Sequence, residues 1–587
     1  MKKKAIACLL SLMMVLAGFG CTPNRLMKAE KGGEAAASVL AESATKPDAE
    51  PTSTPSPTPA PEIFTSGNYG YILLEDGTVQ IIGFRRDASD QAIPNALEGH
   101  PVTRIGDGAF YGCVSLTSIT LPDSVTTIGD EAFSGCESLT SITIPDSVLT
   151  IGDGAFSDCE SLTIITIPDS VTSMGRNPFE GCSRLASFWV SPDHPVLAVI
   201  DDVLFEKAGK KLVCYPLGKA GSSYAIPQGI QCIGDRAFLK CDSLTSVTIP
   251  DSVTSIDESA FAGCSKLTSI TLPDSITTIG DEAFEHCYSL TGITLPDGVT
   301  TIGQWAFCFC SSLTDITIPD SVTTIGDKAF YWCSSLTSIT LPDGVSAIGD
   351  MTFYKCDNLT TITLPDGVMT IGEEAFAGCS KLTSITLPDS VTTIGDKAFL
   401  ECGSMASFQV SPNHPVLAVI DDVLFEKASK KLVCYPLGKI GSSYAIPQGI
   451  QCIGNYAFSD CYGLTSITLP DSITTIGNHA FSYCYGLTSI TLPDSVTTID
   501  DGAFYMCEYL TSITIPDSIT SIGEYAFAGC KLTNITLPDN VTSISEYAFA
   551  GCESLTATVG RDSYAAQYCK ENGIPYTYAD GLDWLNH

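Results

Sequence analysis

The sequence lacks the residues from which most catalytic sites are built. Its 587 residues include six histidines, and it contains no His-Glu-x-x-His pair, phosphate-binding glycine loop or Gly-x-Ser-x-Gly elbow. Basic residues are scarce as well, because 30 lysines and arginines stand against 66 aspartates and glutamates. The formal net charge of −36 argues against nucleic acid or an anionic membrane surface as a partner. We predict a non-enzymatic protein with no cofactor and no metal.

Long apolar runs are also missing, apart from one near the N-terminus. Ala5 to Phe19 is apolar over 15 residues and follows three lysines. This run is too short for a usual membrane span but is typical of an export signal, here residues 1–20. Gly18-Phe19-Gly20-Cys21 resembles a bacterial lipoprotein cleavage site, although Gly18 stands where such sites carry leucine. We predict export, lipidation of Cys21 and a place at the cell surface; simple cleavage and secretion is the alternative.

Residues 21–62 show no apolar period, and proline, serine and threonine dominate residues 46–61. Such a segment cannot bury a core and favours an extended chain. We therefore expect a linker that holds the following domain away from its anchor.

The rest of the chain repeats one pattern of about 23 residues, for which residues 139–159 are an example. Seventeen Phe-x-x-Cys modules recur, and their cysteines are 23 residues apart within each of three runs, except for a last step of 22. A fixed period of this size predicts a solenoid, in which stacked units share one hydrophobic core.

Each repeat predicts one coil. Ile142 and Ile144 share one face of a short strand, which Pro145 ends because proline has no N–H for a ladder. After a turn and a short second strand, Asp153 is placed to cap a short helical turn. The inward-facing residues of that turn are Ala155, Phe156 and Cys159.

The pattern resembles the BspA-like leucine-rich repeat of bacterial surface proteins, a Leu-x-x-Ile-x-Leu-Pro strand followed by Ile-Gly-x-x-Ala-Phe-x-x-Cys. The resemblance covers about residues 64–577, without the asparagine ladder of commoner leucine-rich repeats. It implies an α/β solenoid of about 23 residues per coil over residues 102–552, with a parallel β-sheet on one face, short second strands, and helical turns on the other face. We expect a β-hairpin cap at residues 63–101, and a C-terminal cap with a short helix at residues 553–587.

Two nearly identical segments interrupt the period, at residues 186–234 and 406–454. They differ at only four positions. Each is one coil enlarged by an insertion, and β-rich runs flank residues 207–210, so we expect a projecting hairpin. A binding role and a structural role are equally open for these two inserts.

Cysteine is abundant, and 17 of the 25 cysteines occupy one periodic apolar position. Stacked equivalent side chains run parallel, and free cysteine behaves as a small buried hydrophobe, so we predict a reduced core ladder without metal. Cys214, Cys308 and Cys434 lie off this column, and their state is left open. Members of the ladder include Cys113, Cys136, Cys159, Cys264, Cys287, Cys333, Cys379 and Cys484.

Other chemistry-bearing residues favour structural roles. His194 and His414 occupy the same loop position beside a proline, where we expect a solvated turn and no metal ligand. The repeated aspartates of Pro-Asp-Ser and Gly-Asp fit turns and caps better than a calcium-binding column.

Aromatic residues gather where the coils differ most, between the phenylalanine and the cysteine and just beyond the cysteine. Exposed aromatic side chains are enriched in interfaces, so we regard these as a candidate binding surface; sideways packing of the rings between coils is an equal alternative. They are Phe309, Tyr331, Trp332, Tyr354, Tyr462, Tyr483, Tyr485, Tyr505 and Tyr509.

The resemblance implies an adhesin-like surface protein that binds an extracellular protein or glycan of host or neighbouring cells. Many weak equivalent sites would give it strength through avidity. The alternatives are an accessory protein that binds extracellular polysaccharide, and a passive surface-coat spacer. Membrane contact is expected only through the N-terminal lipid anchor, and no oligomeric state is predicted.

Overall fold

The computed structural model describes residues 62–85 and 92–580. The predicted signal peptide, the lipidation site Cys21, nearly all of the predicted linker and residues 581–587 lie outside these ranges. Within them, no helix combines the length and the apolar composition that crossing a bilayer requires.

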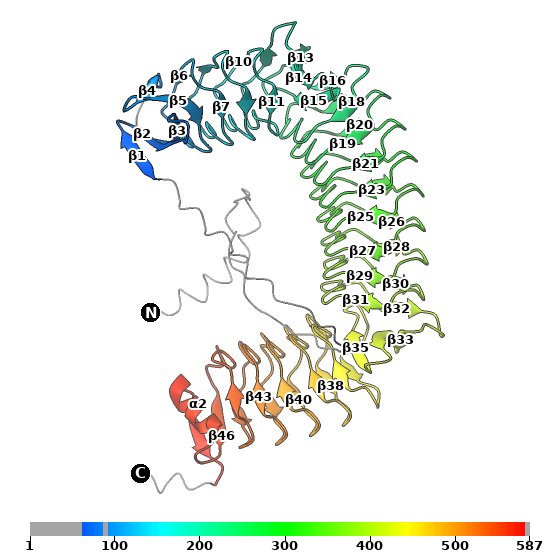
Figure 1. The fold of residues 1–587 in the computed structure, drawn as a ribbon. Helices are drawn as coiled ribbons and strands as arrows, with labels where there is room; N and C mark the ends of the chain where they lie inside the picture. Colours follow the sequence, from blue (N-terminus) through cyan, green and yellow to red (C-terminus); the bar gives the residue numbers. More distant parts are fainter. Residues whose placement is uncertain (1–61, 86–91, 581–587) are drawn as a thin grey trace, which may run out of the picture. The chain divides into compact units, whose positions relative to one another are not determined.

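Each ordinary coil consists of a first strand, a second strand and a turn segment (Figure 1). In the coil that contains Cys159, the first strand is β8 (Ser141–Thr143) and the second strand is β9 (Thr150–Ile151). Its turn segment is residues 152–160, from the glycine after the second strand to the residue after the cysteine. The same three parts recur along the whole solenoid.

The first strands are β6 (Ser118–Thr120), β8, β10 (Ile164–Thr166), β12 (Ser187–Trp189), β16 (Ser223–Ala225), β18 (Ser246–Thr248), β20 (Ser269–Thr271), β22 (Gly292–Thr294), β24 (Asp315–Thr317), β26 (Ser338–Thr340), β28 (Thr361–Thr363), β30 (Ser384–Leu387), β32 (Ser407–Val410), β36 (Ser443–Ala445), β38 (Ser466–Thr468), β40 (Ser489–Thr491), β42 (Ser512–Thr514), β44 (Asn534–Thr536) and β46 (Thr556–Val559). The second strands are β7 (Thr127–Ile128), β9, β11 (Ser173–Met174), β17 (Cys232–Ile233), β19 (Ser255–Ile256), β21 (Thr278–Ile279), β23 (Thr301–Ile302), β25 (Thr324–Ile325), β27 (Ala347–Ile348), β29 (Thr370–Ile371), β31 (Thr393–Ile394), β37 (Cys452–Ile453), β39 (Thr475–Ile476), β41 (Thr498–Ile499), β43 (Ser521–Ile522) and β45 (Ser543–Ile544).

Strands of successive coils pair in parallel and in register. Ile142 lies opposite Ile119 in the first-strand ladder, and Ile151 lies opposite Ile128 in the second-strand ladder. Along β8 the middle residue is buried and its two neighbours are exposed, as the two-residue period of a strand requires. The predicted parallel solenoid is therefore confirmed.

The turn segments are not helical, so the prediction of helical turns was wrong. A helix uses its N–H groups within one segment, whereas here alternate N–H groups leave the coil. Phe133 donates to the Ala155 carbonyl of the next coil, and Ser134 donates back to Glu131 of its own coil. Glu131 and Gly135 take left-handed backbone angles, with φ of 53° and 70°. Each turn segment thereby forms another ladder between coils.

The repeated Gly-Asp pairs also link coils instead of capping a turn. Asp153 Oδ1 accepts the backbone N–H of Arg176 in the next coil at 2.8 Å, and Asp130 does the same for Asp153. A Cβ on Gly152 would lie 2.5 Å from the Asp130 backbone nitrogen. Glycine at this position therefore suits the close approach of neighbouring turn segments, although Asp500 occupies the same slot before Asp501.

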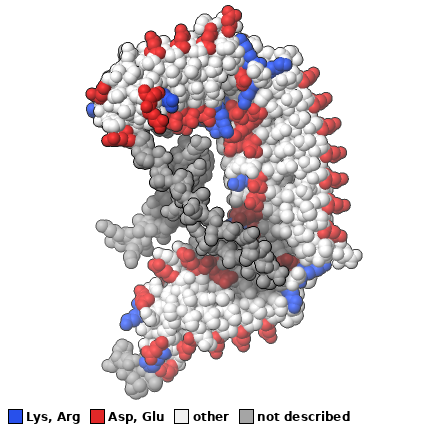
Figure 2. Space-filling model, viewed as in Figure 1, with Lys and Arg blue, Asp and Glu red and all other residues white. Residues whose placement is uncertain are grey.

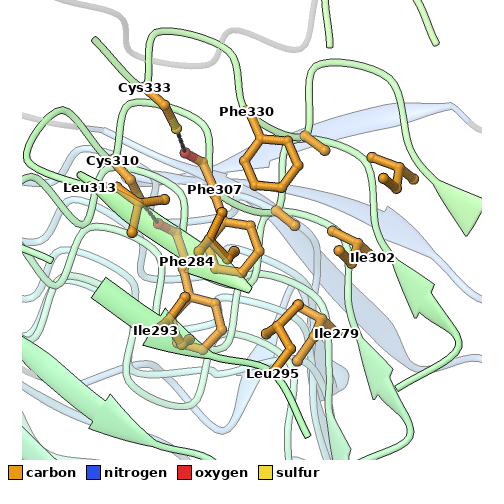
Figure 3. Close-up of a cluster of buried hydrophobic side chains, with 14 of the residues drawn as sticks. Ile279, Phe284, Ile293, Leu295, Ile302, Phe307, Cys310, Leu313, Phe330 and Cys333 are labelled. Atoms are coloured by element: carbon orange, nitrogen blue, oxygen red, sulfur yellow. Dashed lines mark hydrogen bonds between the residues drawn. The ribbon is translucent and has the colours of Figure 1, made fainter. Parts of the chain in front are cut away.

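The interior holds one column of rings and one of thiols (Figure 3). The Phe307 ring stacks between Phe284 and Phe330, with centroids 5.5 and 5.6 Å apart. The Cys310 thiol donates to the Phe284 carbonyl at 3.2 Å, and Cys333 donates to Phe307 at 3.1 Å. The recurring Phe-x-x-Cys module thus supplies both a stacked ring and a hydrogen bond to the preceding coil.

The two inserts replace a second strand by a three-stranded antiparallel meander. The first contains β13 (Leu197–Ile200), β14 (Val203–Glu206) and β15 (Lys211–Cys214), and the second contains β33 (Leu417–Ile420), β34 (Val423–Glu426) and β35 (Lys431–Cys434). The strands do not project, since Val203, Leu204 and Phe205 are buried and β15 pairs in parallel with β17. The turn at residues 207–210 is exposed, as are Asp201 and Asp202 between β13 and β14.

Each insert also divides the hydrophobic interior. Leu204 belongs to the core on the N-terminal side of the first insert, whereas Val203 and Phe205 belong to the core on its C-terminal side. Because adjacent residues of a strand point to opposite faces, β14 is buried on both. The second insert repeats this arrangement with Leu424 on one side and Val423 on the other.

The two ends carry their own elements. β1 (Ile63–Ser66), β2 (Tyr69–Leu73) and β3 (Val79–Phe84) pair antiparallel before β3 joins β5 (His100–Ile105) in parallel, and the short β4 (Ala96–Leu97) pairs with β5. At the other end, α2 (Tyr564–Asn572) lies against β45 and β46, and β47 (Tyr576–Tyr578) pairs with β46. Ser563 caps α2 through the N–H of Ala566.

Candidate interaction surface

The predicted aromatic residues lie on the turn segments, where they form two groups. We call the residues on the segments between 285 and 354 patch 1, and those on the segments between 456 and 547 patch 2. Patch 1 consists of His286, Tyr288, Trp305, Phe309, Tyr331, Trp332 and Tyr354. Patch 2 consists of Tyr456, Tyr462, His479, Tyr483, Tyr485, Tyr505, Tyr509, Tyr525 and Tyr547.

The rings of patch 1 stack from coil to coil. Phe309 lies between His286 and Trp332, with ring centroids 4.8 and 5.9 Å away. Tyr331 stacks on Tyr354 at 4.8 Å, with 7° between the ring planes. Phe309 is therefore stacked on both sides, whereas Tyr331, Trp332 and Tyr354 each have one stacked neighbour.

Patch 2 combines stacked and edge-on pairs. Tyr462 stacks on Tyr485 at 5.3 Å, while Tyr483 meets Tyr505 nearly at right angles, at 5.4 Å. The Lys531 ammonium lies 4.8 Å from the centre of the Tyr509 ring, within the range of a cation–π contact. Tyrosine edges and hydroxyl groups are thus the main features of this surface.

The sequence left two alternatives for the aromatic residues, an exposed binding surface and sideways packing between coils, and the structure contains features of both. The rings do pack sideways between coils, as the second alternative states. Several nevertheless remain open to solvent, with exposed fractions of 38% for Trp332, 55% for Tyr462 and 56% for Tyr509. The other predicted residues are partly buried. The contacts leave a continuous aromatic surface on each group of coils.

Sequence reasoning missed a second aromatic slot, two residues after the glycine of each turn segment. Trp305, Tyr456, Tyr525 and Tyr547 occupy it, and they contact rings of the predicted slots or of the neighbouring coil. The signal was present in the sequence, because this slot follows the same coil period and holds Gly-x-aromatic in three of these coils and Ser-x-Tyr at Tyr547.

The slot just before the cysteine has an unfavourable backbone for large residues. Phe309, Trp332 and Tyr483 all have φ of 57°, in the left-handed region. For a non-glycine residue this conformation is less stable by about 1–2 kcal/mol. Glycine fills the slot at Gly135 and Gly263, among other coils. Bulky aromatic residues at this slot are therefore not explained by backbone stability.

Electrostatics make patch 1 nearly neutral. Burial raises the pKa of Glu285 to about 7, and the charge of Glu282 adds to the effect. Desolvation lowers the pKa of His286, whose Nδ1 lies 2.8 Å from the Tyr288 hydroxyl. Burial also raises the pKa of Tyr331. Near neutral pH Glu285 is therefore only partly ionised, while His286 and Tyr331 favour their neutral forms.

The cysteine column lies in the interior and away from both patches. All 23 cysteines within the described ranges are free, and the eight ladder members named from the sequence are buried. Burial raises the pKa of Cys159 to about 12, which keeps the thiol protonated. Cys214, thought to be off the column, interacts with both Cys182 and Cys241 and continues the column through the first insert. In the part of the chain that the structure describes, no group of three or more potential ligands is arranged to hold a metal.

The two insert histidines are buried, so the expectation of solvated turns was wrong. His194 Nδ1 accepts the backbone N–H of Leu197 at 3.0 Å, and its Nε2–H donates to the Pro168 carbonyl at 3.1 Å. Both ring nitrogens are used within the chain, and desolvation lowers the pKa of His194. His414 makes the same pair of contacts in the second insert. These histidines hold the inserts to the preceding coils.

Acidic side chains repeat from coil to coil over the surface, whereas basic side chains gather in a few places (Figure 2). Two aspartates per coil have different surroundings. Asp146, of a Pro-Asp-Ser turn, is exposed, and Asp153, of a Gly-Asp pair, bonds the next coil. Much of the negative charge is thus a product of the repeat itself.

Comparison with known proteins gives one family and several related structures. A family model described as "BspA type Leucine rich repeat region" matches residues 103–213, 219–336, 323–444 and 438–556. A leucine-rich cell surface protein from Faecalibacterium prausnitzii A2-165 is 28% identical over 86% of this chain and 97% of its own, with a TM-score of 0.44. The pneumococcal vaccine antigen PcpA is 23% identical over 65% of this chain and 96% of its own, with a TM-score of 0.42. The leucine-rich repeat protein TpLRR from T. pallidum is 35% identical over 33% of this chain and 86% of its own, with a TM-score of 0.28. No curated protein matches the sequence.

Proposed function

The chain belongs to the BspA-type leucine-rich repeat family, and from that premise we propose that it is a non-catalytic surface protein that binds another protein through patches 1 and 2. The observation that carries the proposal is the pair of continuous aromatic surfaces on the turn segments. Tyrosine and tryptophan dominate protein interfaces because they combine apolar area with a hydrogen-bonding edge.

The ring geometry favours a protein ligand over a polysaccharide. A sugar ring that stacks needs an open aromatic face. In patch 1 Phe309 lies between His286 and Trp332, and one face of Tyr331 is covered by Tyr354; in patch 2 Tyr462 and Tyr485 each cover one face of the other. The stacking reduces the open ring face, and the tyrosine hydroxyl groups suit the carbonyls and apolar side chains of a protein surface.

The slot before the cysteine is left-handed in every kind of coil, and it holds Lys240, Lys355 and Met506 as well as Phe309 and Trp332. Its backbone therefore does not select for aromatic residues. Repetition over several coils further allows many weak contacts to add up through avidity.

The experiment is an array of extracellular matrix proteins and glycans, probed with the exported chain. A triple variant, Trp332→Ser with Tyr354→Ser and Tyr485→Ser, should lose at least tenfold in binding while its circular dichroism is unchanged. The matched control changes three residues outside the patches that are about half exposed: Leu149→Ser, Ile164→Ser and Met369→Ser. Equal binding by both variants would refute the proposal, and binding to glycans alone would favour polysaccharide capture.

Anchoring and capping belong to the same proposal. We infer that the chain is exported and held at the surface by lipid on Cys21, which metabolic labelling with a fatty-acid analogue tests: Cys21→Ser should abolish the label and release the protein. We also infer that β1–β3 and α2 act as caps. Deleting residues 564–580 should then cause aggregation, because the core beside Phe549 and Ala557 would be uncovered.

A further inference from the structure

The ladder of second strands stops at β11, immediately before the first insert (Figure 1). In the preceding coil, the carbonyls of Leu149 and Ile151 accept the N–H groups of Thr172 and Gly175 at 3.0 and 2.8 Å. The equivalent carbonyls one coil later are those of Thr172 and Met174. Neither accepts a hydrogen bond from any residue that the structure describes. The sheet therefore ends with two unpaired acceptors.

The apolar column loses its cover at the same place. Ile128 and Ile151 are fully buried, because the next coil lies over each of them. Met174, the next member of the column, is partly exposed. An apolar side chain beside two unpaired carbonyls is the surface that a further strand would cover.

A cleft of about 420 Å³ lies along this edge. Residues 172–177 line one wall, and Val196, Leu197, Lys211 and Val213 of the first insert line the other. The insert strands leave this space because β15 pairs with β14 and β17, and not with β11. The volume is within the range of sites that hold ligands.

We propose that this cleft binds an extended segment of a partner polypeptide, which adds to β11 as a parallel strand. Its N–H groups donate to the carbonyls of Thr172 and Met174, as the next coil does elsewhere. The register of the ladder, with Thr150 opposite Ser173 and Ile151 opposite Met174, continues into the segment. A serine or threonine then lies opposite Ser173, and an apolar side chain covers Met174.

Charge adds a further requirement. Ordinary coils have an aspartate where this coil has Arg176, and the aspartate accepts the N–H of the next coil. Arg176 cannot accept a hydrogen bond; its side chain is 52% exposed, lies 3.2 Å from Glu258 and lines the cleft. A carboxylate two residues after the segment's apolar side chain would lie opposite Arg176, in a cleft that Lys211, Asp153, Glu206 and Asp235 also line. The chain's own sequence Thr-Ile-Gly-Asp, at residues 127–130, satisfies all three requirements.

The second insert provides a comparison. β31 likewise ends its sheet, and a cleft of about 30 Å³ lies beside it. That cleft reaches Leu400 and Tyr435 and is not lined by Val416 or Leu417, the equivalents of Val196 and Leu197, so it overlaps the first cleft only in part. Tyr456 and Lys397 line it, with the Lys397 ammonium 4.9 Å from the ring centre; the equivalent residues at the first insert are Arg236 and Asn177, of which Asn177 lines the larger cleft. The site lies outside patches 1 and 2, so the proposal goes beyond the proposed function.

The first test uses a labelled peptide that copies residues 122–130, with binding to the full chain followed by fluorescence anisotropy. We expect one peptide per chain. N-methylation of the peptide's glycine amide removes the donor to the Met174 carbonyl and should weaken binding about tenfold. Replacing the peptide's isoleucine with aspartate should abolish binding. No saturable binding by the unaltered peptide at millimolar concentration would overturn the proposal.

The second test exchanges two residues of the first junction, Asn177 and Arg236, with their equivalents at the second junction, Lys397 and Tyr456. The pair Asn177→Lys with Arg236→Tyr should remove the site, and the pair Lys397→Asn with Tyr456→Arg should create a second site. Circular dichroism and thermal melting check that each variant folds. A loss in the first variant or a gain in the second supports the proposal. A stoichiometry of one in all three chains overturns it.

Discussion

The junctions at the two inserts differ although the inserts are almost the same. Neither cleft is lined by any of the four positions at which the inserts differ, Trp189/Gln409, Asp193/Asn413, Gly209/Ser429 and Ala220/Ile440. The clefts beside the inserts nevertheless differ: one of about 420 Å³ lies at the first junction, and one of about 30 Å³ with a partly different lining lies at the second. The flanking turn segments also differ, as at Asn177 and its equivalent Lys397. A repeated module of a solenoid thus takes its local surface from its neighbours.

The junctions also differ in how their charges are paired. At the first, Lys211 lies 3.3 Å from both Asp235 and Asp257. At the second, the equivalent of Lys211 is Lys431, and the equivalents of the two aspartates are Asn455 and Gly477. Ion pairs of Lys211 therefore mark the first junction, whereas at the second Lys397 pairs with Glu373 and Glu374 and lies over the Tyr456 ring.

The largest expected effect is one that the junctions share. His194→Ala and His414→Ala each remove a buried ring and leave a backbone N–H and a carbonyl without partners. Each variant should lose about 3 kcal/mol of unfolding free energy. Urea denaturation followed by circular dichroism measures this loss. A large loss of unfolding free energy for one histidine variant and none for the other would contradict the shared role of the two histidines.

The next effect should separate the junctions. Burial alone would lower the pKa of Lys211, but Asp235 and Asp257 outweigh it and raise the pKa overall. A raised lysine pKa adds stability below its unfolded value of about 10.5, which is lost as the pH rises through the folded value. Lys211→Met should therefore lose about 1 kcal/mol at neutral pH, and Lys431→Met should lose almost nothing. Equal losses in thermal denaturation at low salt would contradict the assignment.

The smallest effect concerns pH at the second junction. Burial raises the pKa of Asp460, against hydrogen bonds from Tyr462 and Ser459 that lower it. The folded state therefore prefers the protonated carboxyl, so stability is lost as the pH rises from about 4 through the folded value. Asp460→Asn should gain about 0.5–1 kcal/mol at pH 7 and less at pH 3. The control is Lys240→Asn at the equivalent position of the first junction, where no such pH dependence is expected; a gain for Asp460→Asn that is the same at both pH values would count against it.

Much of the fold could be predicted because the repeat encodes it at every level. In residues 139–159 the repeat period, the alternation of buried residues along the strand and the proline that ends the strand all predict the same coil. The parallel ladder follows from stacking such coils. The turn segments were misjudged because Gly-Asp followed by Ala-Phe fits a capped helical turn equally well within one coil. Only the stacking of the coils shows that the Asp153 carboxylate accepts the backbone N–H of Arg176 in the next coil.

The candidate surfaces were less predictable for a related reason. Phe309 and Tyr331 could be named from their slots, but whether such rings pack together or face solvent depends on the neighbouring coil. The open edge at β11 was not visible at all in the sequence. It depends on which strands of the insert pair with one another, and that pairing is a non-local property.

The central claim is that the stacked coils bury their thiols in a column that continues through both junctions, although the inserts divide the apolar interior into three cores. The most direct measurement is brief alkylation of native protein, read for each cysteine by mass spectrometry. The account predicts that Cys182, Cys214 and Cys241 react at least a hundred times more slowly than in urea, while the partly exposed Cys232 and Cys452 react sooner. Column cysteines that react as fast as Cys232 in the native protein would contradict it.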